Sequence, residues 1–447
     1  MPQAALRELL ALGPFEGEAQ IHGADPVLKT PYRVGAAGAA ALAATGIAAA
    51  ELWRLRTGKG QRIAVDLAAA AASLKSTAYL RIDGRAPQAQ WDPFSLFYAV
   101  KDGRWVRFHT NYAHHRAAAL GVLGVGEDVE AAKHAAAGWD GLALEEAVHA
   151  AGGCAALVRS AEEWAAHPHA VAVAGQPLLE IERIGDAPPM PLPKAERPLS
   201  GVRVLDLTRV LAGPTAAKTL AEHGADVLKI TAAHLPDSGE VDIDTGIGKL
   251  SAQLDLREAN GLDTLKALIR EADVFSQSYR PGALAARGLS PEALAKLRPG
   301  IVCVSLSAWG PSGPWQDRRG FDSIVQCVSG MAVAQGSAGA PKLLPCSAID
   351  YVSGYLMAFG AMVALARRAK EGGSWRVRVA LARVGQWIVD LGRVDPAGAV
   401  EPPAATMQTR SPAGVITHLK PVVQLSETPP FWARPPVPLG HDQPEWP

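Results

Sequence analysis

The chain has 447 residues, and its 44 Lys and Arg residues are balanced by 44 Asp and Glu residues. A neutral chain of this length gives no electrostatic reason to expect nucleic acid or an anionic membrane surface as a partner, and it is long enough for more than one domain. The four cysteines (Cys154, Cys303, Cys327 and Cys346) show no Cys-x-x-Cys pairing, which disfavours a disulfide framework or a zinc site and predicts a cytoplasmic protein.

The first part of the chain predicts a mixed α+β unit. Residues 1–32 form an N-terminal extension without the continuous apolar core of a signal peptide. Residues 33–55, RVGAAGAAALAATGIAAAELWRL, are rich in Ala and Gly, which favours a buried helix over a membrane span. Residues 57–74 predict a glycine turn, a strand and a helix, and residues 95–111 predict a hairpin around Lys-Asp-Gly. We therefore predict a second, smaller α+β domain within residues 33–184.

A proline-rich linker at residues 185–198 precedes a different pattern. Apolar runs of strand length alternate with helical segments of 10 to 15 residues, beginning with VRVLDLT, TAAKTLAEHG and ADVLKI. This alternation predicts an α/β domain with a doubly wound, Rossmann-like parallel sheet over residues 199–395, followed by an extended tail at residues 396–447. Ligands of such sheets bind beyond the carboxyl ends of the strands, which here are TRVLAGPT and SLSAWGPSG.

Two common phosphate-binding motifs are missing from the sequence. No G-x-G-x-x-G follows the first strand of this domain, and no G-x-x-x-x-G-K-[ST] occurs anywhere. Nicotinamide dinucleotide and P-loop nucleotide sites are therefore disfavoured. The Ala-Gly-Pro turn before a helix could still present backbone N–H groups to a phosphate, although this signal is weak by itself.

One unit occurs twice in the chain. Residues 46–67 and 360–381 both predict a helix, a glycine turn and a strand, and they align without a gap. In that register Asp350, at the start of a long apolar segment, aligns with Ala36. From the residues alone, Asp350 is an ordinary helix N-cap or a carboxylate nucleophile.

Three segments carry a family resemblance: PLSGVRVLDLTRVLAGPTAAKTLAEHGADVLKI, the stretch from SQSYRPG to GFDSIVQCVSG, and the surroundings of Asp350. Their order and spacing resemble the class III CoA-transferases of the CaiB/BaiF type, which include formyl-CoA transferase, carnitine CoA-transferase and 2-methylacyl-CoA racemase relatives. Residues 33–180 resemble the second half of the same family. The resemblance implies an interlocked homodimer and a chain whose two halves stand in permuted or rearranged order.

The resemblance also implies an activity. Asp350 matches the aspartate that attacks an acyl-CoA thioester and releases CoA, after which CoA passes to another carboxylic acid through anhydride and aspartyl-thioester steps. No tightly bound cofactor is implied, because coenzyme A enters as acyl-CoA substrate. The residues implied for coenzyme A binding are Val210, Ala212, Gly213, Pro214, Lys229, Lys249 and Arg280.

Two alternatives stay open beside the transferase. Racemases of this fold place a His-Asp pair where this chain has Phe321 and Asp322, and Phe cannot carry a proton. A protein that binds coenzyme A without catalysis is the other alternative, since Ala36 lacks the acid and the loop after Lys229 is atypical of the family. We predict no metal site, because the adjacent His114 and His115 point in different directions and have no suitably spaced acidic partner.

Overall fold

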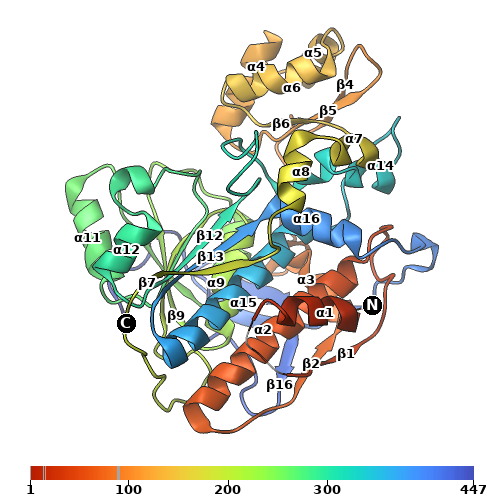
Figure 1. Ribbon diagram of the computed structural model, residues 1–447. Helices are drawn as coiled ribbons and strands as arrows, with labels where there is room; N and C mark the ends of the chain where they lie inside the picture. Colours follow the sequence, from red (N-terminus) through yellow and green to blue (C-terminus); the bar gives the residue numbers. More distant parts are fainter. Residues whose placement is uncertain (1, 14, 16, 88–90) are drawn as a thin grey trace.

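A seven-stranded sheet forms the centre of the molecule in the computed structural model, which describes residues 2–13, 15, 17–87 and 91–447 (Figure 1). The strand order is β10-β9-β8-β11-β12-β13-β7. All neighbouring strands run parallel except β7, which pairs antiparallel with β13 at one edge. The strands are β7 Glu180–Gly185, β8 Arg203–Leu207, β9 Asp226–Thr231, β10 Lys249–Gln253, β11 Val274–Gln277, β12 Val302–Ser307 and β13 Ser374–Ala380. The predicted α/β class with a large parallel sheet is confirmed.

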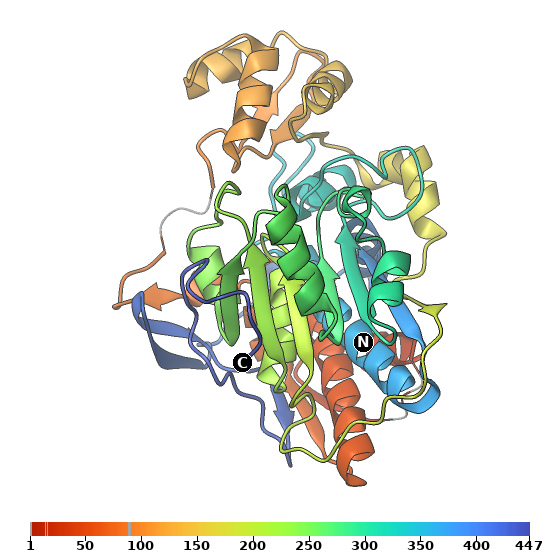
Figure 2. The same ribbon diagram turned by 90° about the vertical axis from the view of Figure 1, so that its left-hand side faces the viewer.

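Helices cover both faces of this sheet (Figures 1 and 2). Successive side chains of β8 point to opposite faces of the sheet and so reach both helix layers. Val204 packs in the core beneath α9, α15 and α2, whereas Leu205 packs in the core beneath α11 and α12. The strand order reverses between β8 and β11, so the loops that follow these two strands diverge and leave a crevice. The covering helices are α2 Val34–Thr57, α9 Ala212–Glu222, α11 Ala259–Ile269, α12 Pro291–Leu297 and α15 Ala348–Glu371.

The two longest helices, α2 and α15, pack against each other in the core. Both are long and apolar enough to span a bilayer, yet 94% of the most apolar window of each is buried inside the protein. The buried helix predicted at residues 33–55 is confirmed. Glycine lets α15 approach α9 closely, because a Cβ on Gly354 would lie 2.5 Å from the carbonyl oxygen of Ala212.

The repeated unit is present twice as predicted. Helix α2 ends at Gly58 and leads into β2 Ile63–Asp66 and α3 Leu67–Ser73, whereas α15 ends at Gly372 and leads into β13 and α16 Leu381–Asp390. The start of α2 is held by a carboxylate from the preceding segment. Asp25 accepts hydrogen bonds from the backbone N–H groups of Gly35 (3.1 Å) and Ala36 (2.8 Å) at the start of α2. A carboxylate therefore caps α2 from outside the helix.

A smaller lobe lies beyond the carboxyl ends of the central strands (Figures 1 and 2). It contains the predicted hairpin and a separate apolar core of its own. Its elements are β4 Phe97–Ala99, β5 Trp105–Phe108, β6 Ala155–Leu157, α4 Ala113–Leu123, α5 Val129–Ala136 and α6 Gly141–Ala150. Between this lobe and the sheet lie α7 Ala161–Ala165, α8 Pro168–Ala174, α13 Asp322–Val328 and α14 Met331–Gln335.

The linker and the two ends of the chain run along the larger body. Arg56 of α2 holds the linker, because its guanidinium donates to the carbonyl oxygens of Pro193, Pro198 and Ser200. In the tail, the indole N–H of Trp446 donates to the Leu268 carbonyl (3.2 Å). The remaining elements are α1 Pro2–Leu10, β1 Gln20–His22, β3 Arg81–Ile82, α10 Glu240–Gly246, β14 Thr406–Ser411, β15 Gly414–Leu419, β16 Val423–Leu425 and the 3₁₀ helices Ser76–Tyr79, Ala285–Arg287 and Pro396–Gly398. The exact domain boundaries stay a prediction.

Candidate active site

A cavity of about 400 Å³ lies at the crevice where the strand order reverses. The sheet supplies residues 209–212 and 278–281, which follow β8 and β11, and residues 306–308 at the end of β12. The smaller lobe supplies Tyr112, His114 and His115 on the other side. The backbone N–H of Arg209 donates to Ser278 Oγ (3.1 Å) and joins the loops after β8 and β11. Walls from both lobes of a single chain therefore meet at this point.

Asp350 opens into this cavity from the first turn of α15. Its side chain is only partly exposed, and the residues on either side of it, Ile349 and Tyr351, are buried in the core. The partial positive charge at a helix start favours a carboxylate in the first turn. The helix thus fixes the direction of the one acidic side chain that lines this cavity in the described part of the chain.

A second carboxylate stands directly behind Asp350. Asp322, the first residue of α13, accepts a hydrogen bond at Oδ2 from the backbone N–H of Asp350 (3.0 Å). Its Oδ1 accepts from the side-chain amide of Gln326, whose own oxygen accepts from the backbone N–H of Leu344 (2.7 Å). Asp322 therefore joins α13 to the start of α15, as Asp25 does at the start of α2.

Burial shapes the protonation of both carboxyl groups. Burial raises the pKa of Asp322 to about 6, although hydrogen bonds from Asp350 N–H and Gln326 oppose this shift. Burial raises the pKa of Asp350 well above its usual value, and the nearby charge of Asp322 raises it further. Ionisation of Asp322 therefore opposes ionisation of Asp350, and Asp350 can act as a nucleophile only once it is ionised.

A buried ion pair supports the loop after β8. Lys249 Nζ donates to Asp206 Oδ2 (2.7 Å) and to the carbonyl of Pro214 (2.8 Å), and the Thr208 hydroxyl donates to Asp206. A Cβ on Gly213 would lie 2.3 Å from Thr208 Cβ, so this position requires glycine. These contacts connect β8, β10 and α9 beneath the cavity.

The same loop carries backbone strain. Val210 has a φ of 69°, which is unfavourable for a β-branched residue. Strain of this kind persists only where the surrounding structure imposes it, and it occurs mainly at ligand-binding positions. The conformation places Val210 on the cavity wall beside Ala212.

The structure divides the predicted binding residues into two groups. Val210, Ala212 and Arg280 line the cavity with Asp350. Gly213 and Pro214 follow within α9, where they shape the loop. Lys229 and Lys249 point elsewhere: Lys229 pairs with Asp242 at 2.7 Å, Lys249 pairs with Asp206, and neither lysine lines a described cavity. Both ammonium groups are buried and paired with carboxylates, so the structure does not support a direct contact of either lysine with a ligand.

Several residues of the cavity were missed by sequence reasoning. Arg209, Arg318 and Arg319 belong to its wall in addition to Arg280, and the guanidinium of Arg318 is paired with Glu146 (2.6 Å). His115 is buried, and its Nδ1 has no hydrogen-bond partner among the described residues. Burial, reinforced by the neighbouring His114, lowers the pKa of His115 to about 3. The motif HTNYAHHR was visible in the sequence, but only the fold brings its Tyr112, His114 and His115 to the cavity that Asp350 lines.

The tryptophans of the loop after β12 have a packing role. Trp309 and Trp315 are 1% and 4% exposed, and their rings pack together at 5.1 Å between centroids. Trp164 of α7 joins the cluster. Neither Trp309 nor Trp315 is among the residues that line the Asp350 cavity. These rings therefore hold the loop in place from behind.

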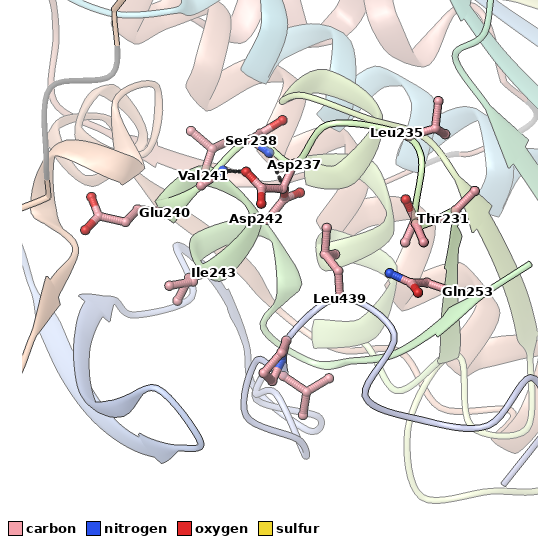
Figure 3. Close-up of a pocket in the computed structure, with 15 residues that line it drawn as sticks. Thr231, Leu235, Asp237, Ser238, Glu240, Val241, Asp242, Ile243, Gln253 and Leu439 are labelled. Atoms are coloured by element: carbon pink, nitrogen blue, oxygen red, sulfur yellow. Dashed lines mark hydrogen bonds between the residues drawn. The ribbon is translucent and has the colours of Figure 1, made fainter. Parts of the chain in front are cut away.

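A second cavity of about 710 Å³ adjoins the first, and Leu235 belongs to the walls of both (Figure 3). Thr231 and Gln253, the last residues of β9 and β10, form one side of it. The segment of residues 237–243 and the tail residues 437–439 form the others. Within the described ranges, no group of three or more metal-ligating side chains occurs. The two cavities thus adjoin at Leu235, and Asp350 lines the smaller of them.

Comparison with known proteins decides the family. The family model described as "CoA-transferase family III" matches residues 13–190 and again residues 199–418. The chain belongs to this family. The sequence resemblance to the class III CoA-transferases is thereby confirmed.

Known CoA-transferases are similar to this chain over different fractions of its length. An "Acetyl-coenzyme A transferase nodX" from Hypoxylon pulicicidum is 34% identical over 201 residues, which is 43% of this chain and 34% of that protein. An "Acyl-CoA transferase" from Gibberella moniliformis is 27% identical over 83% of this chain and 73% of its own length. The crystal structure of a hypothetical protein, Rv3272, from Mycobacterium tuberculosis is 30% identical, with a TM-score of 0.40 over 48% of this chain and 62% of that one. The chain thus spans only about a third of the length of the first relative.

Proposed function

We propose that this protein moves coenzyme A between two carboxylic acids, with Asp350 as the covalent nucleophile. The observation that carries this proposal is the position of Asp350: it lies at a helix start, in front of a second buried carboxylate, in a cavity whose lining also includes four arginines. Membership of the family supports CoA transfer in general. The roles of individual residues rest on the geometry.

The proposed reaction proceeds in four acyl transfers. A carboxylate oxygen of Asp350 attacks the thioester carbonyl of the donor, the C–S bond breaks, and CoA thiolate leaves a mixed anhydride. The thiolate attacks the aspartyl carbonyl, which releases the donor acid and forms an aspartyl-CoA thioester. The acceptor carboxylate then displaces CoA to form a second anhydride. Finally, the thiolate attacks the acceptor carbonyl, which yields the new acyl-CoA and frees Asp350.

The walls of the cavity suit the anionic parts of this substrate. Guanidinium groups are good partners for phosphates and carboxylates, and Arg209, Arg280, Arg318 and Arg319 all line the Asp350 cavity. The first backbone N–H groups of α9 have no side-chain cap and add a further anion-binding element. The pyrophosphate and pantetheine portions of coenzyme A would occupy this cavity, with the adenosine end in the cavity of Figure 3.

Intact-mass spectrometry tests the nucleophile. The protein is incubated with a panel of acyl-CoA thioesters and then with hydroxylamine, which traps anhydrides and thioesters. We expect an adduct at Asp350 that hydroxylamine removes, and a loss of transfer of about 10³-fold or more in Asp350→Asn. Asp317→Asn serves as the control, because Asp317 is an exposed carboxyl outside the lining of the cavity.

Two results would contradict this role for Asp350. Full transfer activity in a folded Asp350→Asn variant would exclude it as nucleophile. Binding of thioesters without any adduct or turnover would instead support the non-catalytic alternative.

A second candidate function is exchange of the α-proton of a 2-methylacyl-CoA. One observation favours it: His115, with an unpaired Nδ1, lines the same cavity as Asp350 and could act as a second base. Its pKa of about 3 makes it a weak base, so transfer remains the leading proposal. Incorporation of deuterium from heavy water at the α-carbon, abolished in His115→Ala, would establish the exchange reaction.

The assembly and location of the protein also stay proposals. We retain a homodimer in a cytoplasmic setting, as the family resemblance and the unpaired cysteines suggest. Sedimentation velocity on the purified protein tests the dimer directly.

A further inference from the structure

A third cavity, of about 280 Å³, adjoins the Asp350 cavity at the carboxyl ends of β11, β12 and β13. Four residues belong to the walls of both cavities, namely Tyr279, Pro281, Leu306 and Ser307. The end of β13 also joins the two walls, because Ala380 lines the third cavity and the next residue, Leu381, lines the Asp350 cavity. The two cavities therefore share one side over several residues.

The start of α15 brings Asp350 to this shared side. Ile349, the residue before Asp350, packs against α16, since a Cβ on Gly385 would lie 3.2 Å from Ile349 Cδ1. Helix α16 follows β13 directly, and α15 itself contacts β12 and β13 (Figure 1). Asp350 thus lies close to the strand ends that form the third cavity.

The strand order gives the direction of a bound thioester. Arg209 and Arg280 follow β8 and β11, which precede β12 and β13 in the order of the sheet. The cavity of Figure 3 lies in the opposite direction, at the ends of β9 and β10. If the phosphates bind these arginines and the thioester carbonyl lies at Asp350, the third cavity is the adjoining space on the far side for the acyl chain.

The third cavity contains no unpaired charge among its described lining residues. Its two charged side chains, Glu180 of β7 and Arg378 of β13, face each other across the two strands and form a two-point ion pair, with Arg378 Nε donating to Glu180 Oε2 at 2.8 Å. Gln277 and Ser307 each accept a hydrogen bond from a backbone N–H of the loop that follows (2.8 and 3.0 Å). A second carboxylate on a substrate would therefore meet no free cation here.

Much of the remaining wall of the third cavity is apolar. It is formed by Pro177, Pro281, Leu306, Pro311, Val379 and Ala380. An alkyl chain gains free energy when it leaves water for such a space, whereas an ionised carboxylate would lose its hydration without gaining a partner. The third cavity thus differs in kind from the Asp350 cavity with its arginines.

We infer that the third cavity takes the acyl chain of the thioester, and that this protein therefore transfers CoA between acids with an uncharged, apolar chain and disfavours dicarboxylic acids. This inference rests on the proposed function and specifies its substrate class. In each anhydride the acyl group of the donor or of the acceptor is bonded to Asp350. Both acids consequently place their chains in the same cavity in turn, and both are selected by it.

Steady-state transfer by the intact protein tests the selection, with acetyl-CoA, hexanoyl-CoA and adipyl-CoA as donors and a common acceptor. Hexanoyl and adipyl groups have equal numbers of carbons and differ only in the terminal carboxylate, while an acetyl group has no chain to fill the cavity. We expect kcat/KM for hexanoyl-CoA to exceed the values for the other two thioesters by about tenfold or more.

A matched pair of variants tests the location. Glu180→Gln frees the guanidinium of Arg378 to bind a carboxylate, so the preference for hexanoyl-CoA over adipyl-CoA should fall by about fivefold or more. Glu182→Gln is the control, because Glu182 pairs with Arg376 on the same two strands but lies outside the wall of the third cavity. Its preference should equal that of the wild type.

The outcomes separate this inference from the proposed function. Transfer from adipyl-CoA as fast as from hexanoyl-CoA in the wild type overturns the inference alone, because CoA transfer itself is then intact. The same preference in folded Glu180→Gln as in Glu182→Gln also overturns it, since the chain would then lie elsewhere. No transfer from any of the three donors overturns the inference together with the proposed function.

Discussion

At the scale of single residues, the site depends on two carboxyl groups with different tasks. Asp350 faces the cavity, and Asp322 lies behind it and caps the start of α15. The family resemblance predicted Asp350 as the nucleophile, whereas its position before a long apolar helix also fitted an ordinary N-cap. The sequence could not reveal Asp322 as its partner, because these two residues are 28 positions apart and become neighbours only through folding. The same holds for Lys249, whose burial beside Asp206 is a property of the sheet.

A pH profile tests the coupling of the two carboxyl groups. Asp322→Asn removes the neighbouring negative charge while it keeps a side-chain oxygen for the N–H of Asp350. The pKa of Asp350 should fall, because the charge of Asp322 is one cause of its elevation. We expect the rate of adduct formation, which rises with pH as Asp350 ionises, to reach its plateau at lower pH in the variant.

The matched control for this profile is Asp263→Asn, on the exposed side of α11. The profile of this variant should coincide with that of the wild type. If the acid limb of Asp322→Asn also coincides with it, the carboxyl groups titrate independently and the coupling is excluded.

At the scale of elements, small residues set the position of the loop that lines the cavity. Helix α15 carries Asp350 and contacts α9, which begins with the loop of residues 209–212. Gly354 lies directly against α9, with Thr215 Cβ only 2.8 Å from the place of a Cβ. The distance between the nucleophile and the strained Val210 therefore depends on one missing methyl group.

Gly354→Ala tests this dependence. The added methyl group would overlap Ala212 and Thr215, so α9 must shift, and we expect a loss of stability of about 1–3 kcal/mol. Binding of CoA should weaken as well, because the shifted helix carries the loop with it. Chemical unfolding and calorimetric titration measure the two effects.

Gly121→Ala provides the comparison, since Gly121 lies within α4 and its Cβ would meet no atom within 4 Å. That variant should be unchanged or up to about 1 kcal/mol more stable. A Gly354→Ala variant of wild-type stability would show that α9 and α15 can separate freely.

The sequence predicted these elements better than it predicted their contacts. Strands β8, β9, β11 and β12 and their intervening helices follow from hydrophobic patterning, because buried parallel strands are continuous apolar runs. Strand β10 was missed, since KLSAQ is short and half polar. The second cavity, shown in Figure 3, was also missed, because its walls come from β9, α10 and the distant tail.

At the scale of the whole molecule, the two halves of the chain share one core. Helix α2 from the first half packs against α15 and belongs to the same apolar cluster as β8 and β12. The tail returns to the first half, where β16 pairs with β2. The permuted order of the two family halves along the chain remains a prediction. Because both halves contribute to one core, either order along the chain is compatible with the same site.

Cleavage of the linker tests whether the two halves of the chain form one folded unit. A protease site inserted between Lys194 and Ala195 lies in an irregular segment at the surface. After cleavage, we expect the two fragments to elute together in size exclusion, because separation would expose α2 and α15 to water. Elution as two separate fragments under native conditions would show that the halves are independent domains.

The carboxylate of Asp25 at the start of α2 has a counterpart at the start of α15. It grips the first N–H groups of a helix that has Ala36 where the other copy has Asp350. A carboxylate that bonds the first N–H groups of a helix therefore occurs at both helix starts, whereas a carboxylate that opens into a cavity occurs only at the start of α15 of the two. The surroundings decide this difference, because Ala36 is 2% exposed within the core, where an ionised side chain would be costly.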